Sequence, residues 1–381
     1  MRTRRIPLTI MRGGTSRGLY LNARDLVDVP DRDALILRLF GSPDPRQIDG
    51  LGGADLLTSK VAIVGPPTVP GADVDYTFGQ VGVDVPIVDH KGNCGNISAG
   101  VGPYAVRNGY VTATATATDG LCPVRIHNTN TGKIIVAHVP VADGAVVEDG
   151  DVHIDGVPGT GAGIFLDYSR TAGAATGSSL PTGSPTDVVD VPGVGAVEVS
   201  VVDFANPVVY VRAADVGLTG TESPDHFRAD PDVLDRLERI RAVGAVLCGM
   251  ADDVGAVAAQ SPTFPNLSVV AAPRSFRALT DGRTIAAGDA DIVARIFAMR
   301  MLHQSYAGTG MSNLGAAATI PGTLVHDLVP VGPGSRRDVR VAHPCGVAVV
   351  SVETSPEGLV TRVGYERTAR LIMEGTAFVP A

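Results

Sequence analysis

The sequence predicts an α+β protein of two similar domains, each a curved, mostly antiparallel sheet wrapped around one central helix. The composition favours strands and turns, because 46 Gly and 27 Pro occur among the 381 residues together with abundant Val and Thr. The order of predicted elements recurs in the second half of the chain, which indicates a duplication. One run of small residues in each half suits a helix that a sheet can surround closely.

The first repeated element is a hairpin followed by a short segment containing alanine and aspartate. Residues 8–22 and 197–212 are each predicted to form a strand, a turn and a second strand. Tyr20 and Tyr210 match, so the offset between the copies is 210 − 20 = 190. The first turn, Arg12-Gly13-Gly14-Thr15-Ser16-Arg17-Gly18, combines hydroxyl and guanidinium groups suited to binding a carboxylate. An ordinary turn with solvated arginines is an equal alternative.

Lys60 stands where a Gly-rich segment, residues 47–59, meets the apolar strand Val61–Val64. Desolvation beside an apolar strand lowers the pKa of a lysine towards that of a useful base. A surface lysine with its ammonium in water is the more common alternative. Lys60 is therefore a candidate base that needs support from other residues.

The next repeated element is the start of a helix of small residues. In Asn93-Cys94-Gly95-Asn96 the cysteine would meet free N–H groups and the positive end of the helix dipole, which favours a thiolate. An asparagine cap beside a small buried cysteine is an alternative of equal weight. The second half has Thr309-Gly310-Met311-Ser312-Asn313 before its own helix. Pairing Gly95 with Gly310 gives an offset of 310 − 95 = 215.

A third repeated element is a strand that precedes a turn and an alternating strand. It occurs at Val124–Asn128 and at Val339–His343, again with an offset of 340 − 125 = 215. The boundary between the copies falls in residues 171–185, where Gly, Ser, Thr and Pro are concentrated. We therefore expect domains at 1–178 and 179–381, with a last helix that can return to the first domain.

Amphipathic helices are expected to cover the sheets as scaffold, because their apolar residues recur every three or four positions. Two similar domains would direct both central helix starts into one interdomain cleft, which we expect to be the active site and to bind an anion. The amphipathic helices are predicted at residues 31–40, 231–248 and 289–303.

Several classes of protein are excluded by composition and spacing. The net charge is −9 and no long basic block occurs, so a nucleic acid is not an expected partner. The four cysteines lie far apart without a CxxC pair, which supports neither a disulfide framework nor a zinc site, and no metal is expected. No apolar run reaches the roughly 18 residues of a membrane span, and no signal peptide is recognised, so a soluble, cytoplasmic protein is expected.

Eight motifs along the chain together point to a known family: Met11–Gly18, Gln47–Gly53, Thr58–Lys60, Asn93–Asn96, Asn206-Pro207, Thr219–Glu222, Ile320–Thr323 and Arg367–Arg370. Through these motifs the sequence resembles the PrpF family over essentially its whole length. Two departures are visible: Arg17 stands where lysine is frequent, and Cys345 stands where many members have serine. They bear on the substrate more than on the reaction type.

The resemblance implies a diaminopimelate-epimerase-like fold and a cofactor-independent isomerase of unsaturated di- or tricarboxylates. Acids of the 2-methylaconitate, 4-oxalomesaconate, aconitate or methylitaconate type are the substrates that it implies. By position, the catalytic lysine falls on Lys60 and the catalytic cysteine on Cys94. Substrate contacts are expected from the hairpin turn and both helix starts: Arg12, Thr15, Ser16, Arg17, Asn93, Gly95, Asn96, Asn206, Thr309, Gly310, Met311 and Ser312.

The expected reaction is a 1,3-allylic proton shift or a cis-trans isomerisation through a dienolate, with Lys60 as leading base and Cys94 as acid or second base. An amino-acid racemase is a second candidate, but it needs a thiol at both helix starts, and the second one has none. A non-catalytic accessory protein is a third. A small polycarboxylate is the expected partner, with neither a nucleic acid nor a membrane, and a homodimer stays open.

Overall fold

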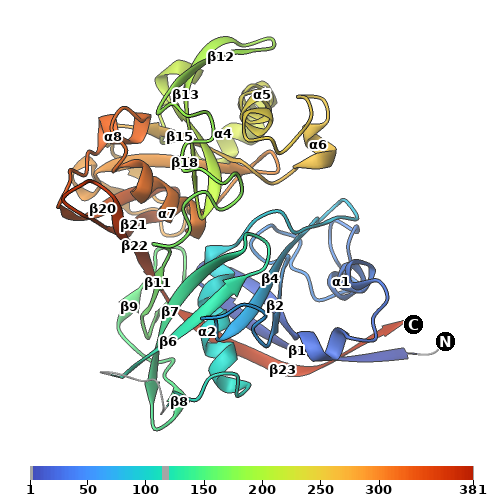
Figure 1. Cartoon of the computed structure of the whole chain (residues 1–381). Coiled ribbons are helices and arrows are strands. Elements are labelled where there is room, and N and C mark those ends of the chain that lie inside the picture. Colours follow the sequence, from blue (N-terminus) through green and yellow to red (C-terminus); the bar gives the residue numbers. More distant parts are fainter. Residues whose placement is uncertain (1–2, 114–119, 381) are drawn as a thin grey trace. The chain divides into compact units, whose positions relative to one another are not determined.

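The computed structural model describes residues 3–113 and 120–380 in two compact units (Figure 1). Unit 1 comprises Met1–Leu166 and Arg367–Ala381, and unit 2 comprises Asp167–Glu366. The chain therefore returns to unit 1 at its end. The returning segment is a strand, β23 (Ala369–Pro380), and not the helix that the sequence suggested, because it pairs antiparallel with β1 (Thr3–Gly13) along nearly its whole length.

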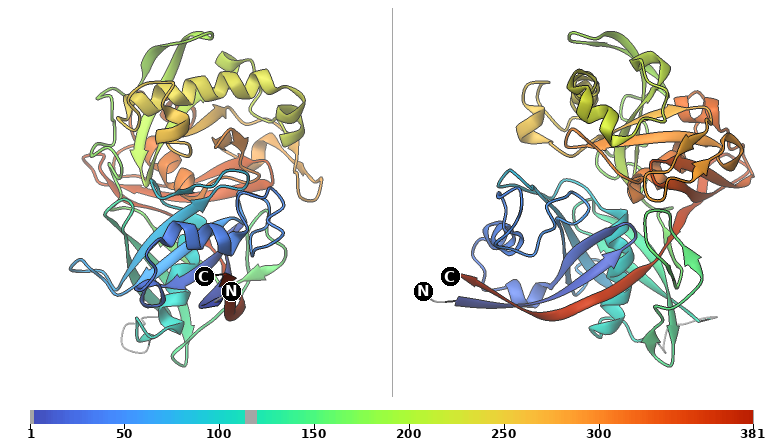
Figure 2. Two further views of the ribbon diagram at one scale, coloured as in Figure 1. Left: turned by 90° about the vertical axis from the view of Figure 1, so that its right-hand side faces the viewer. Right: turned by 180° about the vertical axis from the view of Figure 1, so that it is seen from behind.

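Unit 1 is a sheet curved around the central helix α2 (Gly95–Arg107), which contacts β1, β2, β3, β6, β7 and β23 (Figure 2). The strands that form the sheet with β1 and β23 are β2 (Ser16–Asn22), β3 (Lys60–Gly65), β4 (Val74–Val81), β6 (Leu121–Asn128) and β7 (Lys133–Ala142). The smaller elements are η1 (Ala23–Leu26), α1 (Arg32–Phe40), β5 (Val88–Asp89), β8 (Ala145–Val146), β9 (Val152–His153), β10 (Thr160–Gly161) and β11 (Ile164–Asp167).

Unit 2 has a similar sheet around α7 (Gly308–Ala317), which contacts β13, β14 and β21. Its longer strands are β12 (Asp187–Val191), β13 (Gly195–Phe204), β14 (Asn206–Arg212), β15 (Asn266–Ala271), β18 (Ile292–Ala298), β20 (Arg336–His343), β21 (Gly346–Thr354) and β22 (Val360–Arg367). The remaining elements are η2 (Ala214–Val216), α4 (Pro224–Ala229), α5 (Pro231–Leu247), α6 (Val257–Gln260), β16 (Phe276–Arg277), β17 (Thr284–Ile285), η3 (Ala287–Asp289), β19 (Met301–Leu302) and α8 (Leu324–Leu328).

The strands of the two units pair in the same order, which confirms the predicted duplication. In unit 1, β1 and β2 form a hairpin, β2 runs parallel to β3, β3 antiparallel to β4, β4 parallel to β6, and β6 antiparallel to β7. In unit 2, the strands β13, β14, β15, β18, β20 and β21 repeat this series of antiparallel and parallel pairs. The α+β class with two similar domains is therefore confirmed.

The register of the two central helices differs from the sequence expectation by two residues. Gly102 and Gly315 occupy the same place, because a Cβ on either would come within 3 Å of Val139 or Val352, which correspond on β7 and β21. The offset is 315 − 102 = 213, and the first helical residues give the same value, 308 − 95 = 213. Pairing Gly95 with Gly310 was therefore wrong. The strands that follow the helices are offset by 215, so the connection from α7 to β20 is 215 − 213 = 2 residues longer than the connection from α2 to β6.

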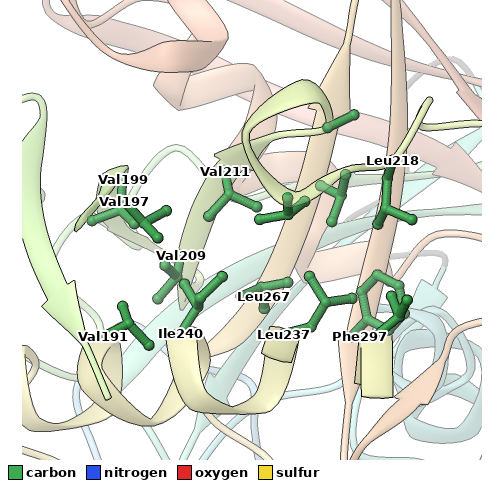
Figure 3. Packing of buried hydrophobic residues seen from close by; sticks show 14 of the residues in the cluster. Val191, Val197, Val199, Val209, Val211, Leu218, Leu237, Ile240, Leu267 and Phe297 are labelled. Atoms are coloured by element: carbon green, nitrogen blue, oxygen red, sulfur yellow. The ribbon is translucent and has the colours of Figure 1, made fainter. Parts of the chain in front are cut away.

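Two of the three predicted scaffold helices are confirmed, as α1 and α5. Helix α1 begins at Asp31, whose side chain accepts a hydrogen bond from the Ala34 N–H, and Leu237 and Ile240 of α5 lie in the core of unit 2 (Figure 3). The third prediction, a helix over 289–303, was wrong. That segment forms β18 and β19, and β18 lies between β15 and β20 with both faces covered, so its apolar run shows no strand alternation. None of the helices in the described ranges is long and apolar enough to cross a bilayer.

Candidate active site

Lys60 begins strand β3 and lies almost entirely inside unit 1. Its side chain and backbone are only 7% exposed, and Nζ donates a hydrogen bond of 2.6 Å to Oε1 of Gln80. The ring centroid of Phe78 lies 5.5 Å from the same nitrogen. Lys60 is thus a buried amine held by an amide and an aromatic face, and the surface-lysine alternative does not apply.

Cys94 is the N-cap residue of α2, with extended backbone angles and no capping hydrogen bond from its side chain. It is the partly exposed member of the four cysteines, since Cys122, Cys248 and Cys345 are buried. Its carbonyl accepts hydrogen bonds from the N–H and Oγ of Ser98. The thiol therefore stands at the positive end of a 13-residue helix with its sulfur uncommitted to the cap.

The hairpin turn between β1 and β2 lies directly against the first turn of α2. A Cβ on Gly13 would come 2.3 Å from the Asn96 carbonyl oxygen, and one on Gly14 would come 2.3 Å from Asn96 Oδ1. Asn96 Nδ2 donates to Thr15 Oγ1 at 3.0 Å, and Arg367 Nε donates to Asn96 Oδ1 at 3.2 Å. The two glycines are therefore required for this close approach, which brings Thr15 and a buried arginine to the helix start.

The two arginines of the turn have different surroundings. Arg12 donates to the carbonyl oxygens of Gly14 and Thr368, and burial followed by the nearby Arg370 charge lowers its pKa. The Arg17 guanidinium is half-buried and makes no hydrogen bond or ion pair with side chains in the described ranges. Ser16 is 2% exposed, and its Oγ has no partner among the described residues. Arg12 thus stabilises the turn through its two hydrogen bonds, whereas the Arg17 guanidinium and the Ser16 hydroxyl have no side-chain partner among the described residues.

Gly18 connects the lysine to the helix. A Cβ at this position would come 2.8 Å from the Lys60 carbonyl oxygen and 2.9 Å from Ile97 Cδ1, so β2, β3 and α2 meet here without a side chain. Tyr20, on the same strand, donates to the Ile97 carbonyl at 2.6 Å. Burial raises the pKa of Tyr20 well above its usual range, and the neighbouring Cys94 charge contributes.

In unit 2 the predicted site residues lie at the corresponding hairpin and helix. Asn206 Nδ2 donates to Thr309 Oγ1 at 2.9 Å, as part of the packing of β14 on α7. Gly310, Met311 and Ser312 are buried in the first turns of that helix. Ser312 Oγ has no partner within the described part of the chain.

Two residues of the unit 1 arrangement were not predicted as site residues. Gln80 holds Lys60, but only the β3–β4 register reveals it, since the two lie 20 positions apart and pair across the sheet. Arg367 reaches Asn96 from the far end of the chain, and its presence in the Arg367–Arg370 motif was the one available signal. The described residues contain no group of three His, Cys, Asp or Glu side chains arranged to hold a metal ion.

Comparison with known proteins identifies the family. The model of the PrpF protein family matches residues 3–380. The chain belongs to the PrpF family. It is 50% identical to the 3-methylitaconate isomerase of Eubacterium barkeri, over 98% of this chain and 97% of that protein. It is 41% identical to the 2-methyl-aconitate isomerase of Shewanella oneidensis, over 99% and 97% of the two chains.

Solved structures agree with this assignment. The crystal structure of a methylitaconate-delta-isomerase superposes with a TM-score of 0.81 at 48% identity and covers 100% of this chain and 96% of that one. A hydroxyproline epimerase from Agrobacterium vitis shares the fold alone, with a TM-score of 0.52 at 13% identity over 98% and 93% of the two chains. This PrpF-family chain is an isomerase, and its fold is the one that the sequence resemblance implied.

Proposed function

We propose that this isomerase moves a proton along the allylic unit of an unsaturated di- or tricarboxylate, with Lys60 as the base that removes it. The observation that carries the proposal is the buried Lys60 amine, whose Nζ is held by Gln80. Lys60 begins β3, and its carbonyl lies against Gly18 of β2, where both strands meet the helix that starts at Cys94. A buried amine without an ion-pair partner in the described ranges can accept a proton from carbon. Cys94, at the helix start, is the proposed acid that returns a proton at the far end of the allyl unit.

The proposed substrate is an acid of the 3-methylitaconate type. The support is the 50% identity to a 3-methylitaconate isomerase, against 41% and 40% to relatives named for 2-methyl-aconitate and 4-oxalomesaconate. In such an acid the base would remove the proton from the carbon that bears the methyl group. The electron pair would then form the new internal double bond, and the old methylene carbon would take up a proton and become a methyl group. Substrate and product are isomers, so no other reactant is needed.

Negative charge that develops on the substrate carboxylates needs donors that are already in place. Two donors of unit 1 have no partner among the described residues: the buried Ser16 hydroxyl, and the Arg17 guanidinium, which lies beside Gly53 in the segment before β3. We propose that these groups bind one carboxylate. Asn206 and Thr309–Ser312 stay predicted substrate contacts, with Thr309 already held by Asn206.

The racemase alternative loses further support from the corrected helix register. The N-cap of α7 is Ala307, so the position that corresponds to Cys94 carries no thiol. A two-thiol mechanism needs a cysteine on each face of the substrate carbon.

The experiment that tests the proposed function is an NMR screen in D₂O. The purified protein is incubated with 3-methylitaconate, 2-methylaconitate, 4-oxalomesaconate and trans-aconitate, and product and deuterium position are followed. We expect 3-methylitaconate to turn over fastest and to gain deuterium at the new methyl group. A protein that isomerises none of the four acids and exchanges none of their protons would overturn the proposal.

A further inference from the structure

Every part of the Gln80 amide group takes part in a hydrogen bond, and one of these bonds is to the candidate base. Oε1 accepts the hydrogen bond from Lys60 Nζ, while Nε2 donates to the Ser59 carbonyl at 2.9 Å and to the Leu56 carbonyl at 3.3 Å. Gln80 itself is 4% exposed. Carbonyl oxygens only accept hydrogen bonds, so the amide nitrogen must face them and the amide oxygen must face Lys60. The orientation of the amide is therefore fixed by its surroundings.

The two carbonyls that hold Gln80 belong to the segment that leads into β3. This segment is itself anchored: Ser59 Oγ donates to Gln47 Oε1 at 3.0 Å, the Val81 N–H donates to the Ser59 carbonyl, and the Arg17 N–H donates to the Leu57 carbonyl at 2.8 Å. Gln80 therefore joins the Gly-rich segment to the lysine side chain. Any movement of its amide would also break contacts to this segment.

Strand β4 presents two side chains to Lys60 from one face. Gln80 lies directly opposite Lys60 in the antiparallel β3–β4 pair, and Phe78, two residues earlier, places its ring 5.5 Å from Nζ. Residues two apart on a strand project from the same face. The lysine nitrogen thus lies over the aromatic ring while one N–H is directed at the amide oxygen.

We propose that Gln80 is a positioning residue that directs the Lys60 amine towards the substrate carbon. This inference rests on the proposed function, in which Lys60 is the base. A neutral lysine amine has two N–H groups and one lone pair, so fixing one N–H on Gln80 limits the directions open to the lone pair. Misplacement of a reacting group by about 1 Å can cost about 10²-fold in rate. Gln80 therefore acts on kcat through Lys60, without touching the substrate.

The first test replaces Gln80 with methionine, which has a similar shape but no acceptor. We expect Gln80→Met to lower kcat by about 10- to 100-fold with KM within about twofold, because substrate contacts are intact. The rising limb of the kcat–pH profile should move to lower pH, since the ammonium form loses its acceptor. Gln260→Met, on a partly exposed glutamine in unit 2, is the matched control and should leave kcat and the profile unchanged.

A purely structural role of Gln80 would lower activity equally at every pH, and that outcome would overturn the inference. Gln80→Glu is the second variant, because it keeps an acceptor opposite Lys60 if the methionine variant does not fold. Its carboxylate should stabilise the ammonium form and move the rising limb to higher pH; an unmoved limb contradicts the inference. Lys60→Ala separates the two proposals: if it still exchanges substrate protons, the proposed function fails, whereas an inactive Lys60→Ala beside a fully active Gln80→Met removes only the role of Gln80.

Discussion

The two units of this chain follow the same strand path but differ at the positions of the proposed proton-transfer groups. Lys60 pairs with Gly18 on β2, and Asn266 pairs with Val208 on β14, where 208 − 18 = 190 is the offset of the two hairpins. Asn266 therefore stands in the place of Lys60, and its side chain donates to the Thr263 carbonyl within its own unit. An ionisable amine in one copy corresponds to a structural amide in the other.

The N-cap residues of the two central helices also differ, because one carries an ionisable group and the other does not. Cys94 caps α2, whereas Ala307 caps α7. The contact between hairpin and helix is kept in both units but with its partners exchanged: in unit 1 the helix residue Asn96 donates to the hairpin residue Thr15, and in unit 2 the hairpin residue Asn206 donates to the helix. The duplicated scaffold thus conserves a packing interaction, while the proposed proton-transfer groups Lys60 and Cys94 are present in one copy. We infer that unit 1 supplies the proton chemistry.

The largest expected difference between the units is at the paired positions Lys60 and Asn266. Lys60→Ala should lower kcat by about 10³-fold or more, because a general base contributes roughly 10²- to 10⁴-fold and here also lies in a buried site. Asn266→Ala should cost about 1–3 kcal/mol of unfolding free energy by leaving the Thr263 carbonyl without its donor, with kcat of the folded protein retained. Steady-state kinetics and denaturant unfolding measure both, and similar kcat losses in the two variants would contradict the comparison.

The next effect concerns the cysteines. Cys94→Ser should lower turnover by about 10²-fold with little change in substrate binding, because the thiol acts on the proton and not on the carboxylates. Cys122→Ala, at a buried cysteine on strand β6 of the same unit, is the matched control and should lose only stability. In the wild-type protein iodoacetamide should modify Cys94 first, as peptide mass spectrometry would show. Faster alkylation of any of the other three cysteines would argue against the assignment.

A smaller effect is expected where each unit fills the space beside a buried tyrosine. In unit 1 a Cβ on Gly100 would come 2.3 Å from Tyr20 Oη, whereas in unit 2 the corresponding Asn313 accepts a hydrogen bond from the Tyr210 hydroxyl at 2.8 Å. Gly100→Ala should therefore destabilise the protein by about 1–3 kcal/mol through overpacking. Adding Tyr20→Phe removes the nearest clashing atom but leaves the ring carbon Cζ 2.7 Å from the added Cβ. The clash is therefore relieved in part, and the double variant should be more stable than the sum of the single changes predicts. Additive unfolding free energies would refute this packing.

The smallest effect concerns an ion pair that both units contain. Arg125 binds Asp73 through its backbone N–H and guanidinium, and Arg340 binds Asp291 in the same way. Burial alone would raise the pKa of the Asp291 carboxyl, but the hydrogen bonds from Arg340 outweigh it and lower the pKa.

A lowered folded-state pKa gives stability that is fully present above the ordinary carboxyl pKa and is lost as the pH falls from there through the lowered folded-state pKa. Asp291→Asn should therefore destabilise the protein at pH 7 and cost progressively less unfolding free energy as the pH is lowered below the ordinary carboxyl pKa, as denaturant unfolding at a series of pH values would show. A cost that is independent of pH would show that the ion pair is not its source.

The sequence predicted the parts of this fold that local residues determine. The Gly13-Gly14 turn, the amphipathic helix over residues 31–40 and the small-residue helices each have a local cause, and the repeat of tyrosine and arginine positions led to the duplicated sheet. The segment 289–303 was misassigned because a strand covered on both faces has the same apolar run as a buried helix.

The candidate site was predictable only in part. Lys60 and Cys94 carry chemistry that the sequence displays, but Gln80 is found only through the pairing of β3 with β4. Because of the two-residue error in the helix register, Ala307 was not recognised from the sequence as the counterpart of Cys94. The two extra residues lie in the connection after the helix, which has no sequence signature. That both helix starts share one cleft stays a prediction.

The most direct test of the central claim, that unit 1 supplies the base, is proton exchange into 3-methylitaconate in D₂O by three proteins. The wild type should exchange and isomerise the acid, and Cys94→Ala should still wash out the proton at the methyl-bearing carbon while isomerisation slows. Lys60→Ala should do neither, because the proton is not removed. Exchange by Lys60→Ala at the wild-type rate would contradict the account.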